Sequence, residues 1–196
     1  MRIVAGRLRG RPLAAPPGGA TRPTSDRARE TLFNMLAHGG FAPPGGPPAP
    51  EGMRVLDLFA GSGALGLEAL SRGAVRAVFV EQDAAARAAL RRNIEALDLA
   101  GATQVLRRDA TDLGPLPAPV GSRFDLVLLD PPYRRGLAER ALASALAGGW
   151  LAPDAVAVAE IAADEPAPEP DGFALLETRR SGEAQLAFYR ALSAIE

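Results

Sequence analysis

One stretch decides the fold of this 196-residue chain: Val55-Leu56-Asp57-Leu58-Phe59-Ala60-Gly61-Ser62-Gly63-Ala64-Leu65-Gly66. An apolar run leads into a glycine-rich turn, and a second apolar segment follows the turn. This succession is typical of a buried strand that turns tightly into a helix where the backbone approaches a ligand. The turn contains the pattern GxGxxG, so it predicts a nucleotide-type cofactor site at the carboxyl end of a parallel strand.

Beyond this turn, apolar strand candidates alternate with helical segments. We expect strands at 54–59, 77–81, 103–107, 124–129 and 155–161, with helices near 63–72, 84–98 and 136–147. The alternation predicts an α/β fold with a doubly wound, mostly parallel sheet. The last two strand candidates, 173–179 and 184–190, flank a Ser181-Gly182 turn, which predicts an antiparallel C-terminal edge.

The first 50 residues have a different character. Residues 1–15 hold two strand-like pieces around Gly6 and Gly10, which suggests a hairpin, and 25–37 has helical periodicity with Thr24 or Ser25 as N-cap. A Pro/Gly-rich stretch over 39–52 then predicts a loop or linker. We therefore expect a small N-terminal extension over 1–50 and a main domain over 51–196.

Charge is unevenly distributed along the chain, whose net charge is -1. Residues 1–36 carry seven Arg against Asp26 and Glu30 only, so the remainder is acidic. A basic arm favours contact with a polyanion, because neutralising phosphates releases counterions. The other interpretation is a solvated charged surface. The arginines of the arm that we consider for RNA contact are Arg7, Arg9, Arg11, Arg22, Arg27 and Arg29.

Composition excludes several classes of function. The chain has no cysteine and one histidine, His38, so we expect no disulfide, no thiolate nucleophile and no metal site. No apolar stretch approaches the roughly 18 residues of a membrane span. The start also lacks the apolar core of a secretory signal, so we expect a cytoplasmic protein.

Carboxylates lie near the carboxyl ends of four strand candidates, and these ends of parallel strands line the ligand crevice of such sheets. They are Asp57, Glu81, Asp109 and Asp130. Asp57 would repel a pyrophosphate but attract a cation. S-adenosylmethionine (SAM) carries an ammonium and a sulfonium and no phosphate, so the charges favour SAM. A dehydrogenase with Glu81 on the ribose of a dinucleotide remains the alternative.

Each of these positions has an expected role toward SAM. Glu81 would accept both ribose hydroxyls, and Asp109 would accept the adenine N6 amine while the Ala110 amide approaches the ring. A helix N-cap is the rival role for Asp109. The full set of expected cofactor residues is Asp57, Phe59, Gly61, Gly63, Glu81, Asp109 and Ala110.

The tetrapeptide Asp130-Pro131-Pro132-Tyr133 ends the apolar run 124–129 and predicts methylation of an amine. A carboxylate and the Pro131 carbonyl can both accept hydrogen bonds from one exocyclic amino group, and the ring of Tyr133 can stack on the base that carries it. Arg134 and Arg135 would then hold the phosphate backbone. An ordinary strand-to-loop turn is the alternative for this segment.

These motifs together resemble those of the bacterial 16S ribosomal RNA guanine-N2 methyltransferases of the RsmD type. The resemblance is carried by residues 2–11, by the stretch 22–34, by the block 57–73, by Val80-Glu81 and by 130–136. It implies a Rossmann-like class I methyltransferase fold and SAM as methyl donor. It also implies one guanine of 16S rRNA as target, methylated in an assembled small subunit or a late intermediate. The Pro/Gly-rich loop is longer than the family pattern, and every basic residue is Arg.

Other activities remain open on the residues alone. A DNA adenine-N6 methyltransferase uses the same Asp-Pro-Pro-Tyr chemistry, but normally carries a target-recognition region. A glutamine methyltransferase that acts on release factors has a similar core, yet prefers Asn at the position of Asp130. A non-catalytic ribosome assembly factor is the alternative outside enzymes. For Arg22, Arg27 and Arg29, RNA contact and closure over the cofactor are equally open.

Overall fold

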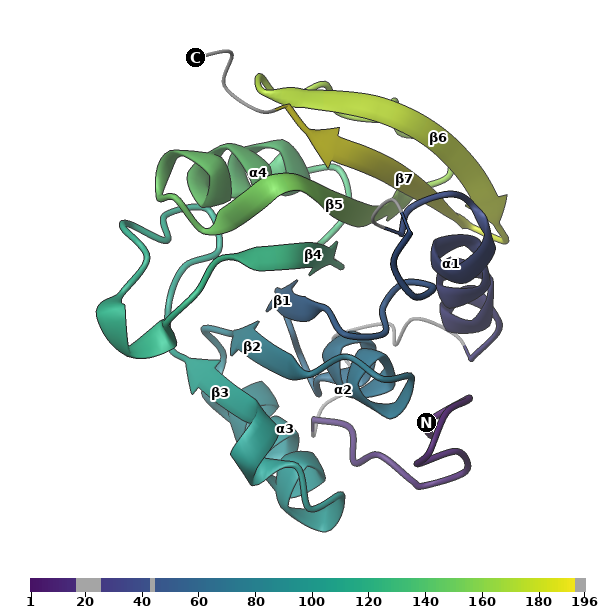
Figure 1. The fold of residues 1–196 in the computed structure, drawn as a ribbon, viewed down its shortest axis with the longest axis vertical. Helices are drawn as coiled ribbons and strands as arrows, with labels where there is room; N and C mark the ends of the chain where they lie inside the picture. Colours follow the sequence, from purple (N-terminus) through teal and green to yellow (C-terminus); the bar gives the residue numbers. More distant parts are fainter. Residues whose placement is uncertain (17–25, 43–44, 193–196) are drawn as a thin grey trace.

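A single mixed sheet of seven strands lies at the centre of the computed structural model, which describes residues 1–16, 26–42 and 45–192. The strands lie in the order β3-β2-β1-β4-β5-β7-β6 (Figure 1). Their bounds are β1 Arg54–Leu58, β2 Arg76–Val80, β3 Thr103–Leu106, β4 Phe124–Leu129, β5 Leu151–Ala162, β6 Phe173–Ser181 and β7 Ala184–Ala191. The first five strands pair in parallel, and β7 pairs antiparallel with both β5 and β6. The predicted parallel sheet with an antiparallel C-terminal edge is confirmed.

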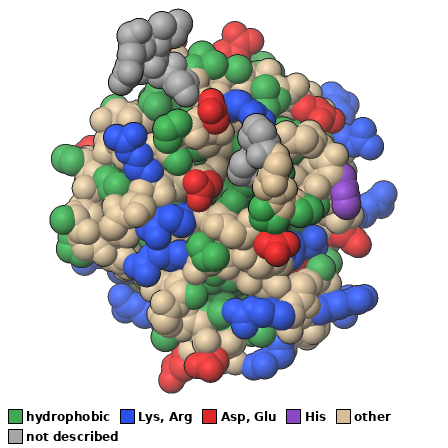
Figure 2. Space-filling view, viewed as in Figure 1, with side chains coloured by type: hydrophobic (Ala, Val, Ile, Leu, Met, Phe, Trp, Pro, Cys, Tyr) green, Lys and Arg blue, Asp and Glu red, His purple; other side chains and the backbone are tan. Residues whose placement is uncertain are grey.

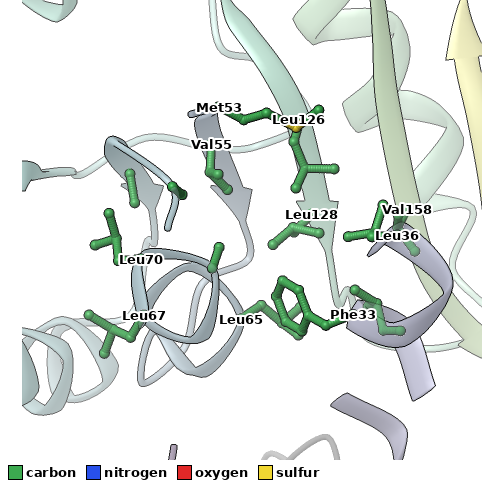
Figure 3. Close-up of a cluster of buried hydrophobic side chains, with 14 of the residues drawn as sticks. Phe33, Leu36, Met53, Val55, Leu65, Leu67, Leu70, Leu126, Leu128 and Val158 are labelled. Atoms are coloured by element: carbon green, nitrogen blue, oxygen red, sulfur yellow. The ribbon is translucent and has the colours of Figure 1, made fainter. Parts of the chain in front are cut away.

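Helices cover both faces of the sheet. They are α1 Asp26–His38, α2 Ala64–Ser71, α3 Ala84–Ala96 and α4 Leu137–Ala147, with short 3-10 turns at Ala100–Ala102 and Ala118–Val120. α1, α2 and α3 bury their apolar residues in one cluster, and α4 buries its own in the cluster on the other face. In Figure 3, Phe33 and Leu36 of α1 lie close to Leu65 of α2 and to Leu128 and Val158 of the sheet.

The described residues of the predicted N-terminal extension pack into the same core as the predicted main domain. Ile3, Leu13, Phe33 and Leu36 are at most 5% exposed and belong to the same buried cluster as Val55 of β1. The predicted hairpin is present as main-chain pairing: the Ile3 amide donates to the Arg11 carbonyl at 2.9 Å, and the Leu13 amide donates to the Met1 carbonyl at 3.0 Å. Only an isolated bridge between Arg2 and Pro12 results, so the segment is a short loop-like hairpin. The predicted N-cap residues Thr24 and Ser25 lie outside the described residues.

Polar contacts fix this extension to α2. The buried carboxylate of Glu68 accepts hydrogen bonds from the amides of Val4 and Ala5 at 2.7 and 2.9 Å, and it pairs with Arg72 at 2.8 Å. The Arg72 guanidinium also lies over the Phe33 ring of α1, 4.9 Å from its centroid. Since α2 begins at the glycine turn, the extension is attached to the element that carries the predicted cofactor loop.

In the described part of the chain, no helix combines the length and the apolar character that a membrane crossing requires.

Candidate active site at the carboxyl edge of the sheet

The glycine turn joins β1 to α2 through left-handed backbone. Phe59, Gly61 and Gly63 have φ values of 59°, 56° and 82°. A Cβ on Gly63 would lie 2.3 Å from Cδ1 of Leu90, so this glycine allows α2 and α3 to pack closely. A Cβ on Gly61 would meet only the Phe59 carbonyl, at 4.0 Å, which leaves the backbone beside Gly61 open to a ligand.

Asp57 is the buried acid of the site. Its side chain accepts a hydrogen bond from the Gly66 amide of α2 at 2.9 Å, and the residue is 1% exposed. Burial raises the pKa of Asp57 well above its ordinary value, the Gly66 hydrogen bond opposes this, and the charges of Asp130 and Glu81 raise it further. The charges of Asp130 and Glu81 therefore reach Asp57 at the carboxyl ends of the central strands. Such a site attracts a cation and repels a pyrophosphate.

Glu81 connects the end of β2 to the glycine turn. One carboxylate oxygen accepts from the Gly61 amide at 2.7 Å, and the other accepts from the Asp83 amide at 2.8 Å. Each carboxylate oxygen has two lone pairs, so both retain capacity for hydroxyl donors. The structure thus brings Glu81 and Gly61 together, as their predicted common role requires.

Asp109 caps a turn rather than a helix. Its Oδ1 accepts from both the amide and the hydroxyl of Thr111 at 2.8 Å, and these two hydrogen bonds lower the pKa of Asp109. The side chain of Gln82, next to Glu81, is a further hydrogen-bond partner. Asp109 is therefore next to the end of β2, with Ala110 buried behind it.

Asp130 follows directly after β4, beside the end of β1, because Leu129 pairs in register with Leu58. Pro131 is buried, Pro132 is exposed and Tyr133 is half-buried. The Tyr133 hydroxyl donates to Oε1 of Glu160 at 2.8 Å.

Glu160, which was not predicted as a site residue, lies within β5 and is 5% exposed. Leu129 of β4 pairs with Ala159 of β5, so Asp130 and Glu160 occupy neighbouring register positions. Side chains alternate along a strand, and Leu128 and Val158 point into the cluster beneath α1 and α2, so Asp130 and Glu160 face the same side. One acid in the otherwise apolar run 155–161 was the signal available in the sequence.

The predicted RNA-contact arginines divide into two groups. Arg7, Arg9, Arg27 and Arg135 are exposed, as are Arg11 and Arg134, which have the protein partners given below. In Figure 2, Arg side chains gather at the lower right, where the N-terminal segment lies in Figure 1. The others have protein partners or are not described. Arg29 is fully buried and donates to the Arg2 carbonyl and to Asp26, both at 2.7 Å; Arg11 donates to the Ala96 carbonyl at the end of α3; Arg134 pairs with Asp164 at 2.8 Å; and Arg22 lies outside the described residues.

Comparison with known proteins adds a family to this geometry. A family model described as "Conserved hypothetical protein 95" matches residues 1–190. The chain is 38% identical to the Ribosomal RNA small subunit methyltransferase D of Escherichia coli K12, over 97% of this chain and 89% of that protein. The chain belongs to the RsmD family. The resemblance to RsmD-type methyltransferases is thereby confirmed.

Other members of the RsmD family and their structures agree. The protein of the same name from Haemophilus influenzae is 35% identical over 97% of this chain and 93% of that protein. A putative methyltransferase structure from Escherichia coli superposes with a TM-score of 0.79 at 36% identity, covering 98% of both chains. A putative methylase structure from Haemophilus influenzae gives a TM-score of 0.76 at 32% identity, over 98% of this chain and 99% of that one. The fold is that of class I methyltransferases.

Proposed function

We propose that this protein transfers a methyl group from SAM to the exocyclic N2 of a guanine in 16S rRNA of the small ribosomal subunit. One observation carries the proposal. Asp130, which opens the Asp-Pro-Pro-Tyr segment, lies close enough to the crevice acids for its charge to raise the pKa of Asp57. A group that accepts hydrogen bonds from an amine therefore adjoins a site suited to a cationic cofactor.

The residues of the crevice fit SAM by their chemistry. The acidic field around Asp57 favours a ligand that carries positive charge and no phosphate, and the Gly61 backbone is open on its outer side. Glu81 would accept the ribose hydroxyls, and Asp109 with Ala110 would contact the adenine. When bound, SAM supplies a methyl group on a positively charged sulfur.

The Asp130 carboxylate and the Pro131 carbonyl would activate the target nitrogen. The lone pair of an exocyclic amine is delocalised into the base, so the amine is a poor nucleophile until it is reoriented. When these two oxygens accept hydrogen bonds from the two N–H groups of the amine, they favour a pyramidal nitrogen aligned with the methyl group. Alignment and local charge would therefore supply most of the catalysis. Held by Asp57, Glu81 and the glycine turn, SAM would supply the methyl group to this nitrogen, and its sulfur would keep the electron pair of the broken bond. The proton on nitrogen then leaves to Asp130 or water.

Guanine suits this acceptor-rich site better than adenine. Beside its amino group guanine has a second donor, N1–H, whereas adenine has an acceptor there. A base extruded from a loop would stack on Tyr133, as single-stranded RNA bases do on aromatic side chains. The names of the curated relatives, ribosomal RNA small subunit methyltransferases, support rRNA as the substrate of this chain too.

A charge-removing variant tests the proposal. We expect Asp130→Ala to abolish methyl transfer to small-subunit RNA while the Kd for SAM changes less than about twofold, because Asp130 holds the target amine. Asp171→Ala is the matched control, since this exposed acid precedes β6 at the opposite edge of the sheet. If Asp130→Ala loses SAM affinity as strongly as activity, its role is structural and the proposal fails.

A further inference from the structure

A second carboxylate, Glu160, lies beside the methylation segment and has no role in the proposed reaction so far. It is 5% exposed, yet its Oε1 accepts a hydrogen bond from Tyr133, the ring expected to carry the target base. The 2.8 Å separation is that of a normal hydroxyl–carboxylate hydrogen bond. A buried acid is thus joined to one end of the aromatic platform.

Glu160 is held by rigid structure. It lies within β5 between two paired strands, with Ala159 opposite Leu129 of β4 and Glu160 itself opposite Leu186 of β7. Tyr133, in contrast, lies in the turn after β4, where Arg134 has a left-handed φ of 59°. The hydrogen bond therefore connects a side chain on a loop to a fixed point in the sheet.

Placing a carboxylate here has a cost in stability. A buried acid is unfavourable unless hydrogen bonds compensate, and an apolar residue would suit the surrounding strand better. Val156 and Val158, which precede Glu160 on the same face of β5, are both apolar and buried. The exception to this pattern is the residue whose carboxylate accepts the Tyr133 hydroxyl.

We infer that Glu160 is a positioning residue that fixes the Tyr133 ring as the stacking platform for the target guanine, an inference that rests on the proposed function. Backbone attachment holds one end of the ring, and the carboxylate holds the hydroxyl at the other end. The ring is therefore ordered before RNA arrives, and base capture does not have to order it. Glu160 acts through Tyr133 and does not itself touch the reacting atoms.

The hydrogen bond can be tested without any activity. The chain has two tyrosines, so a tyrosine ¹³Cζ NMR spectrum contains two signals, and Tyr133→Phe assigns them. We expect the Tyr133 signal to shift in Glu160→Ala and to stay near its wild-type position in Glu160→Gln, because glutamine keeps a carbonyl acceptor. An unchanged signal in Glu160→Ala would overturn the inference.

Kinetics test the consequence. Glu160→Ala and Tyr133→Phe should each lower kcat/KM for small-subunit RNA by about tenfold, the factor that one side-chain hydrogen bond supplies. The double variant should lose no more than either single one, since both remove the same bond. Glu160→Gln should retain most activity, and the Kd for SAM should change less than about twofold in every variant. Glu177→Ala, an exposed acid on β6, is the control.

The outcomes separate the two proposals. Multiplicative losses in the double variant, or a Glu160→Gln variant as impaired as Glu160→Ala, would show that Glu160 does not act by accepting the Tyr133 hydroxyl. Full activity in Glu160→Ala would show that the Tyr133 ring does not need the hydrogen bond to Glu160 and would overturn the inference. A wild-type protein that methylates no RNA would overturn the proposed function and, with it, the platform role of Tyr133.

Discussion

At the scale of single residues, the burial of Asp57 makes the stability of the protein depend on pH. The pKa of Asp57 is raised by burial in the folded protein, so the folded state holds this proton more tightly than the unfolded chain does. The resulting contribution to the free energy of unfolding is present below the ordinary pKa of 3.8 and is lost as pH rises through the raised value.

We therefore predict that Asp57→Asn gains stability relative to wild type as pH rises above about 4. Asparagine keeps an acceptor for the Gly66 amide but carries no charge. Urea unfolding of both proteins at several pH values measures the difference. Parallel profiles would contradict the electrostatic account. The variant should also bind SAM more weakly at neutral pH, because the ammonium loses its counter-charge.

Gly6 gives a second prediction at this scale. Its φ is +81°, and a Cβ would lie 2.0 Å from the Ser71 carbonyl oxygen of α2. We expect Gly6→Ala to lower the free energy of unfolding by about 3 kcal/mol or more. The left-handed φ strains an alanine, and its Cβ also clashes with Ser71, so the two costs add. Gly10→Ala is the matched control: its φ is +84° with open space around it, so the cost should be near 1 kcal/mol. Equal costs would contradict the close-packing explanation.

The sequence predicts part of the site at residue scale. Asp57 lies near the end of an apolar run, and Glu81 and Asp130 end or follow theirs, so their positions alone bring them to the carboxyl ends of the parallel strands. Glu160 could not be assigned in this way, because its meaning depends on the register of β4 against β5. Burial of Arg29 also follows from tertiary packing, since α1 turns this side chain toward the Arg2 carbonyl.

At the scale of elements, α2 and α3 connect the N-terminal extension to the cofactor loop. Glu68 of α2 holds the amides of Val4 and Ala5. Asn93 of α3 is 3% exposed; it accepts from the Ala14 amide at 2.7 Å and donates to the Ala14 and Ser62 carbonyls at 3.0 and 2.9 Å. Asn93 therefore contacts both the N-terminal segment, at Ala14, and the glycine turn, at Ser62.

We predict that Glu68→Ala releases the start of the chain. The variant leaves two amides without their acceptor and Arg72 without its ion-pair partner, a loss that costs several times the roughly 1 kcal/mol of one exposed hydrogen bond. Trypsin should then cut after Arg7 and Arg9 faster than in wild type. Glu95→Ala, an exposed acid on α3, is the control and should cut at the wild-type rate. Unchanged cleavage in Glu68→Ala would show that the arm is held elsewhere.

Element types were more predictable than their pairing. Every predicted strand of the sheet exists, because apolar runs of this length between helices have few other uses. β5 begins at Leu151, four residues before the predicted start, because its first residues pair across a register shift opposite Phe124. The insertion of β7 between β5 and β6 follows from long-range pairing that local pattern does not encode.

At the scale of the whole molecule, part of the positive charge of residues 1–36 lies on exposed side chains of a segment whose apolar residues are buried. Arg7 and Arg9 remain predicted RNA contacts. We expect the double variant Arg7→Glu, Arg9→Glu to weaken binding to small-subunit RNA and to reduce the slope of log K against log salt by about one to two. SAM affinity should not change. Arg123→Glu, at an exposed position directly before β4, is the control, and an equal effect there would contradict a localised RNA surface.

Methyl transfer to a guanine of 16S rRNA is the central proposal, and one labelling experiment tests it most directly. Purified protein is incubated with methyl-labelled SAM and small ribosomal subunits from cells that lack the activity, with free 16S rRNA, duplex DNA and a release factor in parallel. We expect label in a single N2-methylguanine of the small-subunit RNA. Label only in DNA or protein would contradict it, and binding of SAM without any transfer would favour a non-catalytic assembly factor.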